Sequence, residues 1–397
     1  MDIETGVVLA AGEGTRLRPM THNRPKPMLP AGNRPILEHV LDALVDAGVP
    51  ELVLVVGYKR DRVQDHIGPT YRDVPVEYVV QGKQLGSGHA LLQARGTVTG
   101  PMLVVNGDRI VDGGMIRDVA GTSDGGTTLG VIRENNPGRY GSVEAADDRV
   151  VDLVENPDEP AFGFVNAGIY AFTDDVFDRL EATPRTDGVL PITDTILREI
   201  ESGSGEGVRA AEVEGLWADA TYPWDLLYLT RRLLEEGRVD GTEQHPGVYV
   251  SPSARVHEAA TLGSPVVVGE DCEVGAGAVV GPNVALGRNV TVGANATVVG
   301  SVLDTDTRVG VGSTLVETVT GENVDIGAGT VVSGGPGDVT LKDRVFRDRD
   351  LGAVFADRVR TGGRVAADPG TLVGPGAHLH TGVTASGRVG AGTEVTR

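Results

Sequence analysis

Cysteine, lysine and long apolar runs are scarce in this sequence. One cysteine, Cys272, stands among 397 residues, which excludes a disulfide framework and a zinc site built from cysteines. Apolar runs such as Leu52 to Val56 are far shorter than the roughly 20 residues that cross a bilayer. The N-terminus lacks the basic segment and cleavage pattern of a secretory signal. These absences predict a cytoplasmic protein with no membrane partner.

Positive charge is scarce as well. Acidic residues number 56 and basic residues 35, for a formal net charge of −21. Nucleic acids and anionic membranes attract the opposite charge, so neither is an expected partner. An acidic, lysine-poor surface predicts a halophilic protein, whose self-repulsion is screened by a salt-filled cytoplasm. A GC-rich genome that favours arginine codons is the alternative, but arginine bias alone does not explain the net charge.

The composition divides the chain near residue 247. Aromatic residues almost vanish after position 246, where only Tyr249, Phe346 and Phe355 remain. Before that point, apolar strand patterns alternate with amphipathic helix patterns, which predicts an α/β domain with a mostly parallel sheet and ligands at the carboxyl ends of its strands. The expected division is a first domain at 1–232, a helix exit and linker at 233–246, and a second domain at 247–397. Strands are expected at Gly6 to Ala10, Leu52 to Val56, Met102 to Val105 and Gly163 to Phe172, and helices at Ile36 to Ala47 and Trp224 to Gly237.

The second part of the sequence repeats every six residues. This period is too long for strand alternation and too short for a helical solenoid, so it predicts a parallel β-helix with the apolar residues pointing inward. A glycine follows each of the first five repeated residues, at a tight corner where a side chain would crowd. The period is lost around Val302 to Thr320 and returns later. The repeated residues are Val268, Val274, Val280, Leu286, Val292 and Val298, and the glycines are Gly269, Gly275, Gly281, Gly287 and Gly293.

A glycine-rich segment, LAAGEGTRL, follows the first expected strand. Gly12 and Gly14 let backbone N–H groups approach phosphates, and Arg16 adds positive charge. An ordinary strand–helix turn is the alternative for the glycines alone. Farther along, the prolines of RPKPMLP stiffen the loop that carries Lys26. This lysine is therefore expected to reach the same anion.

These residues resemble a known family. The run LAAGEGTRLRPMTHNRPKPMLP is similar to the signature of the sugar-1-phosphate nucleotidylyltransferases. With the repeats behind it, the chain resembles their archaeal bifunctional uridylyltransferase/acetyltransferase type over nearly its whole length. The resemblance implies a Rossmann-like nucleotidyltransferase domain followed by a left-handed parallel β-helix. It also implies Mg²⁺ as cofactor, a nucleoside triphosphate and a sugar-1-phosphate as substrates, and a homotrimer formed through the β-helix.

The resemblance also assigns roles to individual residues. Asp108 in the segment NGD and Asp219 in the segment WAD are the implied Mg²⁺ ligands, and Arg16 and Lys26 are implied to stabilise the transferring phosphate. The amide of Gln81 is implied to read the edge of a pyrimidine, because it can donate and accept together. The implied nucleotide-binding residues are Leu9, Ala10, Ala11, Gly12, Gly14, Thr15, Gln81, Gly86 and Ser87. The implied sugar-binding residues are Gly141, Glu155 and Asn166.

Plainer interpretations exist for several of these residues. Taken alone, Gln81 is a surface glutamine, and Asp108 is a turn or capping residue. His89 is interpreted as a packing residue at the start of a helix rather than as a catalyst.

Two departures from the family pattern bear on the substrate. Residues 155–157 read ENP where many relatives have Glu-Lys-Pro, so a lysine that contacts the sugar phosphate is missing. The family's acetyltransferase site has a His–Tyr pair before an IGAGT-like turn and an asparagine after it. That turn is present at Ile326 to Thr330, but residues 311–320 hold neither His nor Tyr and residues 331–337 hold no Asn. His378 and His380 lie too far after this turn in the sequence to replace the missing His–Tyr pair. The acetyltransferase site is therefore predicted to be lost, and the β-helix is predicted to be an oligomerisation module.

The sequence therefore predicts a sugar-1-phosphate nucleotidylyltransferase. The expected substrates are UTP, or dTTP, and glucose-1-phosphate, and the products are pyrophosphate and a nucleotide sugar for glycan synthesis. A bifunctional N-acetylglucosamine-1-phosphate uridylyltransferase/glucosamine-1-phosphate acetyltransferase is one alternative. A non-catalytic paralogue that senses a nucleotide sugar and regulates a partner is another, although the intact Lys26, Asp108 and Asp219 argue against it.

The charge and the repeats together predict a salt-dependent trimer. Three chains of −21 each repel one another, and the screening length grows from about 3 Å at 1 M salt to about 10 Å at 0.1 M. We expect light scattering across a KCl series to show a trimer at high salt that dissociates or loosens at low salt. A monomer at high salt would contradict this prediction.

Overall fold

A computed structural model of the protein describes residues 3–134, 140–154, 163–203 and 207–396. The chain divides into a first compact unit, made of Met1–Glu13, Pro25–Met28 and Ile36–Ala218, and a second, made of Gly14–Arg24, Leu29–Pro35 and Asp219–Arg397. Within the described residues, no helix has the length and apolar character needed to cross a membrane.

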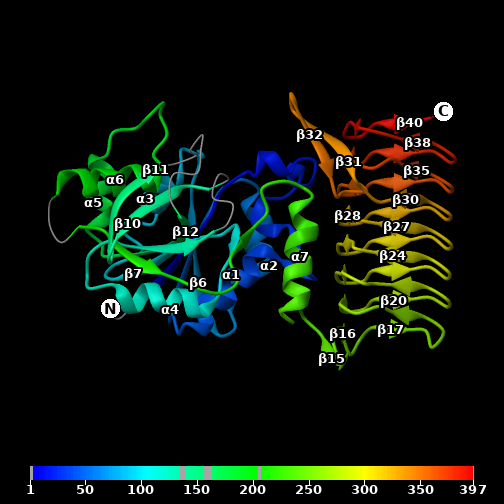
Figure 1. Ribbon diagram of the computed structural model, residues 1–397, viewed down its shortest axis with the longest axis horizontal. Helices are drawn as coiled ribbons and strands as arrows, with labels where there is room; N and C mark the ends of the chain where they lie inside the picture. Colours follow the sequence, from blue (N-terminus) through cyan, green and yellow to red (C-terminus); the bar gives the residue numbers. More distant parts are fainter. Residues whose placement is uncertain (1–2, 135–139, 155–162, 204–206, 397) are drawn as a thin grey trace. The chain divides into compact units, whose positions relative to one another are not determined.

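A mixed sheet forms the middle of the first unit (Figure 1). Its order is β10-β11-β13-β9-β12-β7-β1-β4-β6-β5, and β7, β1, β4 and β6 run parallel. The expected parallel α/β sheet is confirmed for these strands, whereas β12 runs antiparallel to both β7 and β9. The strands are β1 (Thr5–Ala10), β4 (Leu52–Val56), β5 (Thr70–Tyr71), β6 (Val74–Val80), β7 (Met102–Asn106), β9 (Thr128–Arg133), β10 (Ser142–Ala146), β11 (Arg149–Val154), β12 (Phe164–Phe172) and β13 (Arg209–Glu212).

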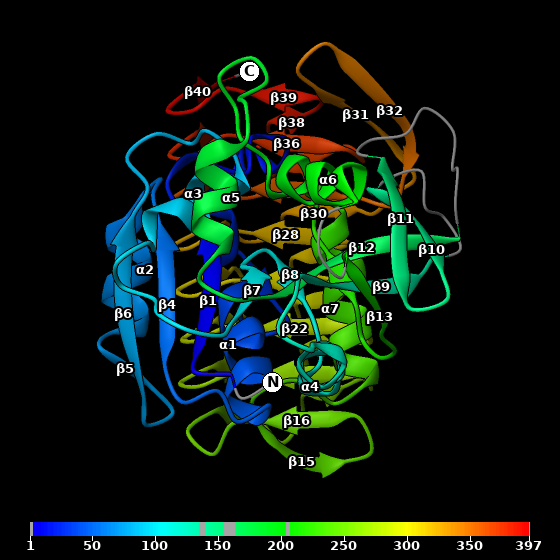
Figure 2. The same cartoon turned by 90° about the vertical axis from the view of Figure 1, so that its left-hand side faces the viewer.

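Helices pack on both faces of this sheet (Figure 2). Val7 and Val8 are both fully buried, because successive strand residues point to opposite faces and both faces are covered. Val8 packs with α1, α2 and α4, and Val7 packs with α3, α5 and α6. The helices are α1 (Ile36–Asp46), α2 (Arg60–Ile67), α3 (Ser87–Gln93), α4 (Gly113–Thr122), α5 (Val176–Ala182) and α6 (Ile192–Ser202), with a 3-10 turn at Lys26–Met28 and the short strands β8 (Arg109–Ile110) and β14 (Ala218–Asp219).

The second unit is a parallel β-helix whose coils stack strand on strand (Figure 1). Each sheet gathers one side of successive coils. One side holds β15 (Thr242–His245), β16 (Val248–Val250), β19 (Val266–Val268), β22 (Val284–Leu286), β25 (Val302–Leu303), β28 (Thr318–Thr320), β33 (Ala353–Phe355), β36 (Thr371–Val373) and β39 (Arg388–Val389). The next holds β17 (Arg255–Val256), β20 (Glu273–Val274), β23 (Thr291–Val292), β26 (Arg308–Val309), β29 (Asp325–Ile326), β34 (Arg360–Thr361), β37 (His378–Leu379) and β40 (Glu394–Val395). The last holds β18 (Thr261–Leu262), β21 (Val279–Val280), β24 (Thr297–Val299), β27 (Thr314–Val316), β30 (Val331–Ser333), β35 (Ala366–Ala367) and β38 (Thr384–Ala385).

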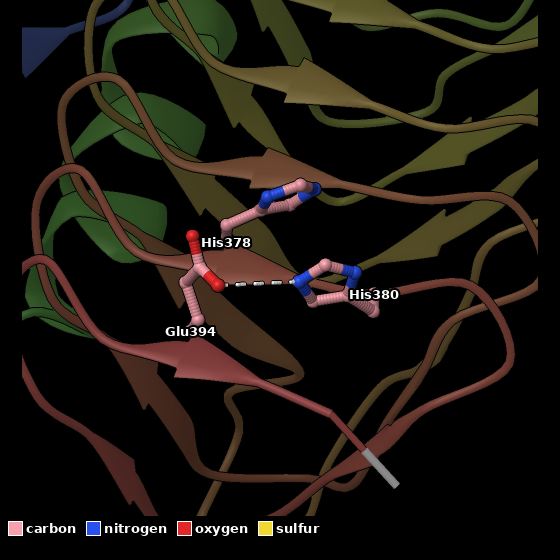
Figure 3. Close-up of side chains that lie close together, drawn as sticks. All are labelled: His378, His380 and Glu394. Atoms are coloured by element: carbon pink, nitrogen blue, oxygen red, sulfur yellow. Dashed lines mark ion pairs between the residues drawn. The ribbon is translucent and has the colours of Figure 1, made fainter.

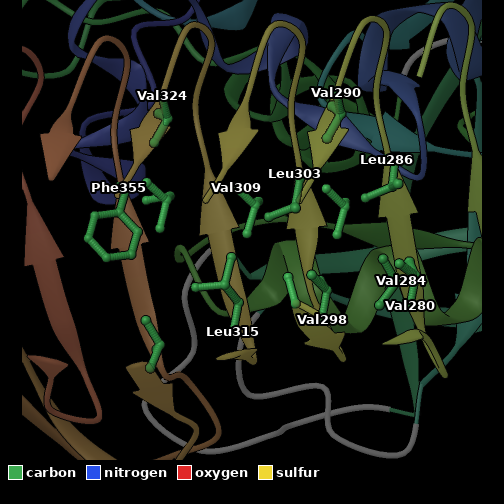
Figure 4. Close-up of a cluster of buried hydrophobic side chains, with 14 of the residues drawn as sticks. Val280, Val284, Leu286, Val290, Val298, Leu303, Val309, Leu315, Val324 and Phe355 are labelled. Atoms are coloured by element: carbon green, nitrogen blue, oxygen red, sulfur yellow. The ribbon is translucent and has the colours of Figure 1, made fainter. Parts of the chain in front are cut away.

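The repeated apolar residues line the inside of these coils, as predicted (Figure 4). None of them is more than 2 % exposed, so each contributes roughly 1.5–3 kcal/mol of burial free energy. The six residues are Val268, Val274, Val280, Leu286, Val292 and Val298.

Crowding explains the glycines that follow them. A Cβ on Gly269 would lie 2.6 Å from the carbonyl oxygen of Leu286, and one on Gly293 would lie 2.8 Å from that of Val309. Both clashes are with the backbone of the next coil. Of the five glycines, Gly281 also has a positive φ, 112°. Elsewhere in the coils, left-handed conformations also fall on residues such as Asn283, a side chain that tolerates them.

The lost period has a structural cause. Val266 pairs with Val284, but Ala285 pairs with Val302, so this coil is one residue shorter than the one before it. A hairpin, β31 (Gly337–Leu341) with β32 (Arg344–Arg349), is then inserted between β30 and β33. Both changes shift the repeat without interrupting the stack.

The boundary between the units differs from the expected domain boundaries at 232 and 247. Helix α7 (Asp225–Glu235) packs on the β-helix, where its Leu234 contacts Val267 and Ala285. Residues 233–246, expected to be a helix exit and linker, contain the end of α7, as expected, and also the strand β15. The second unit also includes the hairpin of β2 (Pro30–Ala31) and β3 (Arg34–Pro35). Contacts remote in sequence therefore set this boundary.

Candidate active site

The parallel strands of the first unit bring several expected residues to one edge of the sheet. The backbone of Leu9 pairs with that of Asn106 at the end of β7, and the N–H of Gly107 donates to the carbonyl of Leu9 at 3.0 Å. The N–H of Gln81 donates to the carbonyl of Val56 at 2.8 Å. These are the carboxyl ends of β1, β7 and β4, where doubly wound sheets bind ligands.

Lys26 and Asp108 form an ion pair at this edge. The Lys26 Nζ lies 2.8 Å from the Asp108 Oδ2, and the side chains are 11 % and 39 % exposed. Burial acts to raise the pKa of Asp108, but the charges of Lys26 and Arg109 outweigh it and hold this pKa below its ordinary 3.8. Asp108 is therefore charged at neutral pH. What the pair adds to stability is lost only as the pH falls below about 3.8, through the lowered pKa.

Two glycines at this edge, Gly57 and Gly12, differ in whether the surrounding atoms leave room for a side chain. A Cβ on Gly57 would lie 2.8 Å from the Gln84 Nε2 and 3.0 Å from the carbonyl oxygen of Ala11, so packing requires glycine there. A Cβ on Gly12 would meet nothing within 4 Å. No protein contact requires glycine at Gly12 among the described residues, which suits a backbone that a ligand approaches closely.

Gln81 is held by partners of its own. The side chain is buried, and its Nε2 donates to the carbonyl of Gly86 at 3.1 Å and to the His89 Nδ1 at 2.9 Å. Burial, and then the charge of Arg185, lowers the pKa of His89, so its ring is neutral at pH 7 and can accept this bond. His89 is thus a partner of Gln81, in line with its interpretation as a packing residue at the start of α3.

Gly86 and Ser87 also have packing roles. Gly86 has φ 102°, and a Cβ there would lie 2.4 Å from the carbonyl oxygen of Leu190. The Oγ of Ser87 accepts the N–H of Ile192 at 3.0 Å. Tertiary packing therefore fixes the start of α3.

Two of the expected sugar-binding residues are described: Asn166 lies in β12, and Gly141 is hydrogen-bonded to it. The Asn166 side chain is buried, with its Nδ2 donating to the Tyr170 hydroxyl at 2.9 Å and its Oδ1 accepting the N–H of Gly168 at 2.8 Å. The carbonyl of Gly141 accepts the N–H of Asn166 at 3.0 Å. Glu155 lies outside the described residues.

Arg109 is a residue that sequence reasoning missed. Its Nη1 donates to the carbonyl of Asn166 at 2.6 Å. Its guanidinium lies 5.8 Å from the centre of the Tyr140 ring and 5.3 Å from that of Trp217, within cation–π range. The Trp217 Nε1 is anchored on the carbonyl of Ala167 at 2.9 Å. The position of Arg109 directly after Asp108 was the one signal available.

The end of the glycine-rich segment LAAGEGTRL, Gly14 to Leu17, belongs to the second unit. Gly14 adopts a left-handed conformation, φ 67°, just before the 3-10 turn Thr15–Leu17, and its carbonyl accepts the Thr21 hydroxyl at 2.8 Å. Arg16 is exposed in that turn. A second 3-10 turn, Met20–His22, follows.

Arg24 lies in a cluster of carboxylates contributed by the β-helix. Its side chain is only 2 % exposed, and it pairs with Asp304 at 2.5 Å, Asp357 at 2.9 Å and Glu322 at 3.4 Å. Burial alone would lower the pKa of Arg24, but the carboxylates outweigh it and raise this pKa. Arg24 thus ties residues 14–24 to three coils.

Asp219 also belongs to the second unit. Its Oδ2 accepts the Thr221 hydroxyl at 3.1 Å. The segment that follows is ordered by Asp225, whose Oδ2 accepts the N–H groups of Thr221 and Tyr222 at 2.9 and 2.7 Å. The Tyr222 ring lies 4.7 Å, centre to centre, from that of Phe346 in the inserted hairpin.

The IGAGT turn of the β-helix has a packing explanation. A Cβ on Gly327 would lie 2.3 Å from the carbonyl oxygen of Gly362, so stacking of the next coil requires glycine there. The Thr330 hydroxyl donates to the carbonyl of Gly327 at 2.7 Å. This turn therefore needs no acetyl-group chemistry to account for its sequence.

The comparisons with known proteins decide the family. Residues 5–235 match the nucleotidyl transferase family, more than half of the chain. The chain belongs to this family. Residues 244–335 match the GMPPB C-terminal domain.

Relatives of differing names are similar to this enzyme. It is 33 % identical to a bifunctional protein GlmU of Methanococcus maripaludis, covering 93 % of this chain and 91 % of that protein. It is 34 % identical to the UTP–glucose-1-phosphate uridylyltransferase AglF of Haloferax volcanii, over 58 % of this chain and 96 % of that protein. A putative glucose-1-phosphate thymidylyltransferase of Bacillus anthracis matches with a TM-score of 0.52 and 26 % identity, covering 57 % of this chain and 94 % of that one. The chain is therefore a sugar-1-phosphate nucleotidyltransferase.

Enzymes of this family typically use a divalent metal. Asp108 fits such an ion, because its carboxylate is ionised and its side chain is 39 % exposed. Carboxylate oxygens are the ligands that hard divalent cations prefer.

Removing the Arg24 side chain tests the carboxylate cluster. We expect Arg24→Met to lower the free energy of unfolding by about 3–5 kcal/mol, because Asp304 and Asp357 are left buried without their cation. Arg288→Met is the control: Arg288 pairs with Asp271 at 3.3 Å, but both side chains are largely exposed. Its loss is expected to stay below about 1 kcal/mol. Equal losses in urea unfolding of the two variants would contradict the prediction.

Proposed function

We propose that the enzyme transfers a uridylyl group from UTP, or a thymidylyl group from dTTP, to glucose-1-phosphate, for glycan synthesis in the cytoplasm. The observation that carries the proposal is the Lys26–Asp108 ion pair at the carboxyl ends of β1 and β7. Support for a glucose phosphate comes from a β-helix sequence with no histidine between His257 and His378. An enzyme without acetyltransferase activity does not produce N-acetylglucosamine-1-phosphate itself, so it has less reason to use that sugar phosphate as its substrate.

The reaction needs positioning and charge more than a base. An oxygen of the sugar phosphate, already an anion, forms a bond to the α-phosphorus, and the bond from that phosphorus to the β-phosphate oxygen breaks to release pyrophosphate. Bringing anions together is the main barrier, so cations and orientation carry the catalysis. Lys26 and Arg16 are proposed to stabilise the transferring phosphate, with the N–H groups at Gly12 and Gly14 supporting the triphosphate.

Mg²⁺ is the proposed ion. Asp108 would hold it, and Asp219 is proposed as a second ligand on the sequence pattern alone. When bound, the ion would neutralise charge on the phosphates. The ionised state of Asp108 at neutral pH keeps this ligand ready.

Arg109 is proposed to replace the lysine that ENP lacks at residues 155–157. It lies beside the expected sugar-binding residues, with one N–H group on the carbonyl of Asn166. Its planar guanidinium carries further donors suited to phosphate. Glu155 is retained as a proposed sugar ligand from the sequence, together with Gly141 and Asn166.

The base site is proposed to read a pyrimidine through Gln81. Both donors of its amide are used within the protein, so its carbonyl oxygen is the group proposed to accept the N3–H of uracil or thymine. The other proposed nucleotide-binding residues are Leu9, Ala10, Ala11, Thr15, Gly86 and Ser87.

A bifunctional enzyme is the second candidate. The 33 % identity to a bifunctional GlmU across 93 % of this chain favours it. In our proposal the β-helix instead joins three chains into a trimer and carries no acetyltransferase activity.

A substrate panel tests the proposed transfer. Pyrophosphate release is measured in molar KCl with Mg²⁺, for UTP, dTTP, ATP and GTP against glucose-1-phosphate and N-acetylglucosamine-1-phosphate. We expect pyrimidine triphosphates, UTP first, with glucose-1-phosphate to give the highest kcat/KM. A purine preference would contradict the base site, and no turnover with any pair would favour the non-catalytic sensor.

Asp108→Asn is expected to lose at least about tenfold in kcat, roughly 1.4 kcal/mol. Asp118→Asn, on the exposed face of α4, is the control and is expected to retain wild-type kcat.

An acetyl-transfer assay separates the two candidates. Free-thiol release from acetyl-CoA with glucosamine-1-phosphate is measured on the full-length protein. We expect no turnover, because general-base help worth roughly 10²–10⁴-fold has no histidine to supply it beside the IGAGT turn. A rate comparable to nucleotidyl transfer would favour the bifunctional enzyme.

A further inference from the structure

A group of potential metal ligands lies on the outer surface of the last coils of the β-helix (Figure 3). His378 in β37 pairs directly with Glu394 in β40. Leu379 is fully buried, so the residues on either side of it, His378 and His380, point outward from the same face of the strand. One potential ligand atom from each of these three side chains lies within 4.8 Å of the other two.

The contacts within this group leave the Nε2 atom of His380 without a hydrogen bond among the described residues. The centres of the two imidazole rings are 4.4 Å apart, and the His380 Nε2 lies 3.7 Å from the Glu394 Oε2. That separation is too long for a hydrogen bond. The Nε2 atom is itself buried and has no hydrogen-bond partner among the described residues, which is uncommon for a buried polar atom.

We propose that His378, His380 and Glu394 bind one divalent transition-metal ion of the zinc class. Two imidazole nitrogens and one carboxylate oxygen suit Zn²⁺, Ni²⁺ or Co²⁺ better than Mg²⁺ or Ca²⁺, which prefer oxygen ligands. Bonds of about 2.0–2.2 Å in a tetrahedral site place ligand atoms roughly 3.4 Å apart. Rotation of the exposed side chains achieves this, since His380 is 42 % and Glu394 72 % exposed.

The ion would fasten the last coil to the coil before it. Within the described residues, β40 is the final strand of its sheet and has β37 as its one neighbour. The apolar residues of this coil, Val389 and Val395, are only partly buried. Terminal repeats of a stacked coil open most readily, and an ion that binds only the closed form stabilises it by mass action. The role is structural and separate from the nucleotidyl transfer.

Zinc binding to the full-length protein tests this site. The protein is freed of metal with a chelator and titrated calorimetrically with ZnCl₂. We expect about one Zn²⁺ per chain, and at least about tenfold weaker binding in His380→Ala and in Glu394→Gln. A double variant, His378→Ala with His380→Ala, that binds Zn²⁺ as tightly as the unaltered protein would overturn the proposal.

His257 offers a matched control. Strands β17 and β37 belong to the same sheet, and His257 directly follows β17 just as His380 directly follows β37. The Nδ1 of His257 accepts the N–H of Ala259 at 3.1 Å. The position that corresponds to His378 is Arg255, two residues before His257, which pairs with Glu273 at 2.7 Å instead of offering a second imidazole. His257→Ala is expected to leave the zinc affinity unchanged, and a loss equal to that of His380→Ala would contradict the assignment.

Hydrogen exchange distinguishes fastening of the coil from simple binding. With Zn²⁺ bound, amide exchange in residues 384–396 is expected to slow, while exchange in the first coil, residues 248–262, stays the same. Excess Mg²⁺ is expected to leave this protection in place. Unchanged exchange at 384–396, or loss of protection on adding Mg²⁺, would overturn the proposal.

Discussion

The burial of Arg24 among three carboxylates is the interaction on which the second unit depends. Asp304, Glu322 and Asp357 come from successive coils of the β-helix, and one guanidinium contacts all of them. Without that cation, buried negative charges would repel one another in a chain whose net charge is already −21. The arginine is supplied by the family's signature segment, whose residues Gly14–Arg24 belong to the same compact unit as the β-helix.

The signature segment therefore has a double task. Arg24 belongs to the second unit and Lys26 to the first, with Pro25 between them. Arg24 is occupied by the β-helix, whereas Lys26 is occupied by Asp108 at the sheet edge. Two basic residues that look equivalent in sequence thus have different partners.

Periodic features of the fold were predictable from sequence. The six-residue repeat identified the inward-pointing residues because each one is buried by its own coil and by adjacent coils that obey the same spacing. Strands such as Leu52–Val56 were predictable because a short, wholly apolar run is buried on both faces of a parallel sheet. Asp108 was placed at a strand end by the same reasoning. The repeat gave no sign of α7 packing on the β-helix or of strand β15 within the expected linker.

The sequence by itself indicated the family and the α/β and β-helix architectures, because these rest on local motifs and short periods, and it proposed the active-site residues by resemblance. Only the tertiary structure decided the partners of individual polar side chains. Arg24 meets carboxylates that lie some 300 residues away in the chain, and Arg109 meets Tyr140 and Trp217. His378, His380 and Glu394 meet because neighbouring coils align them. Such contacts depend on which coils and strands become neighbours, and no local pattern encodes that.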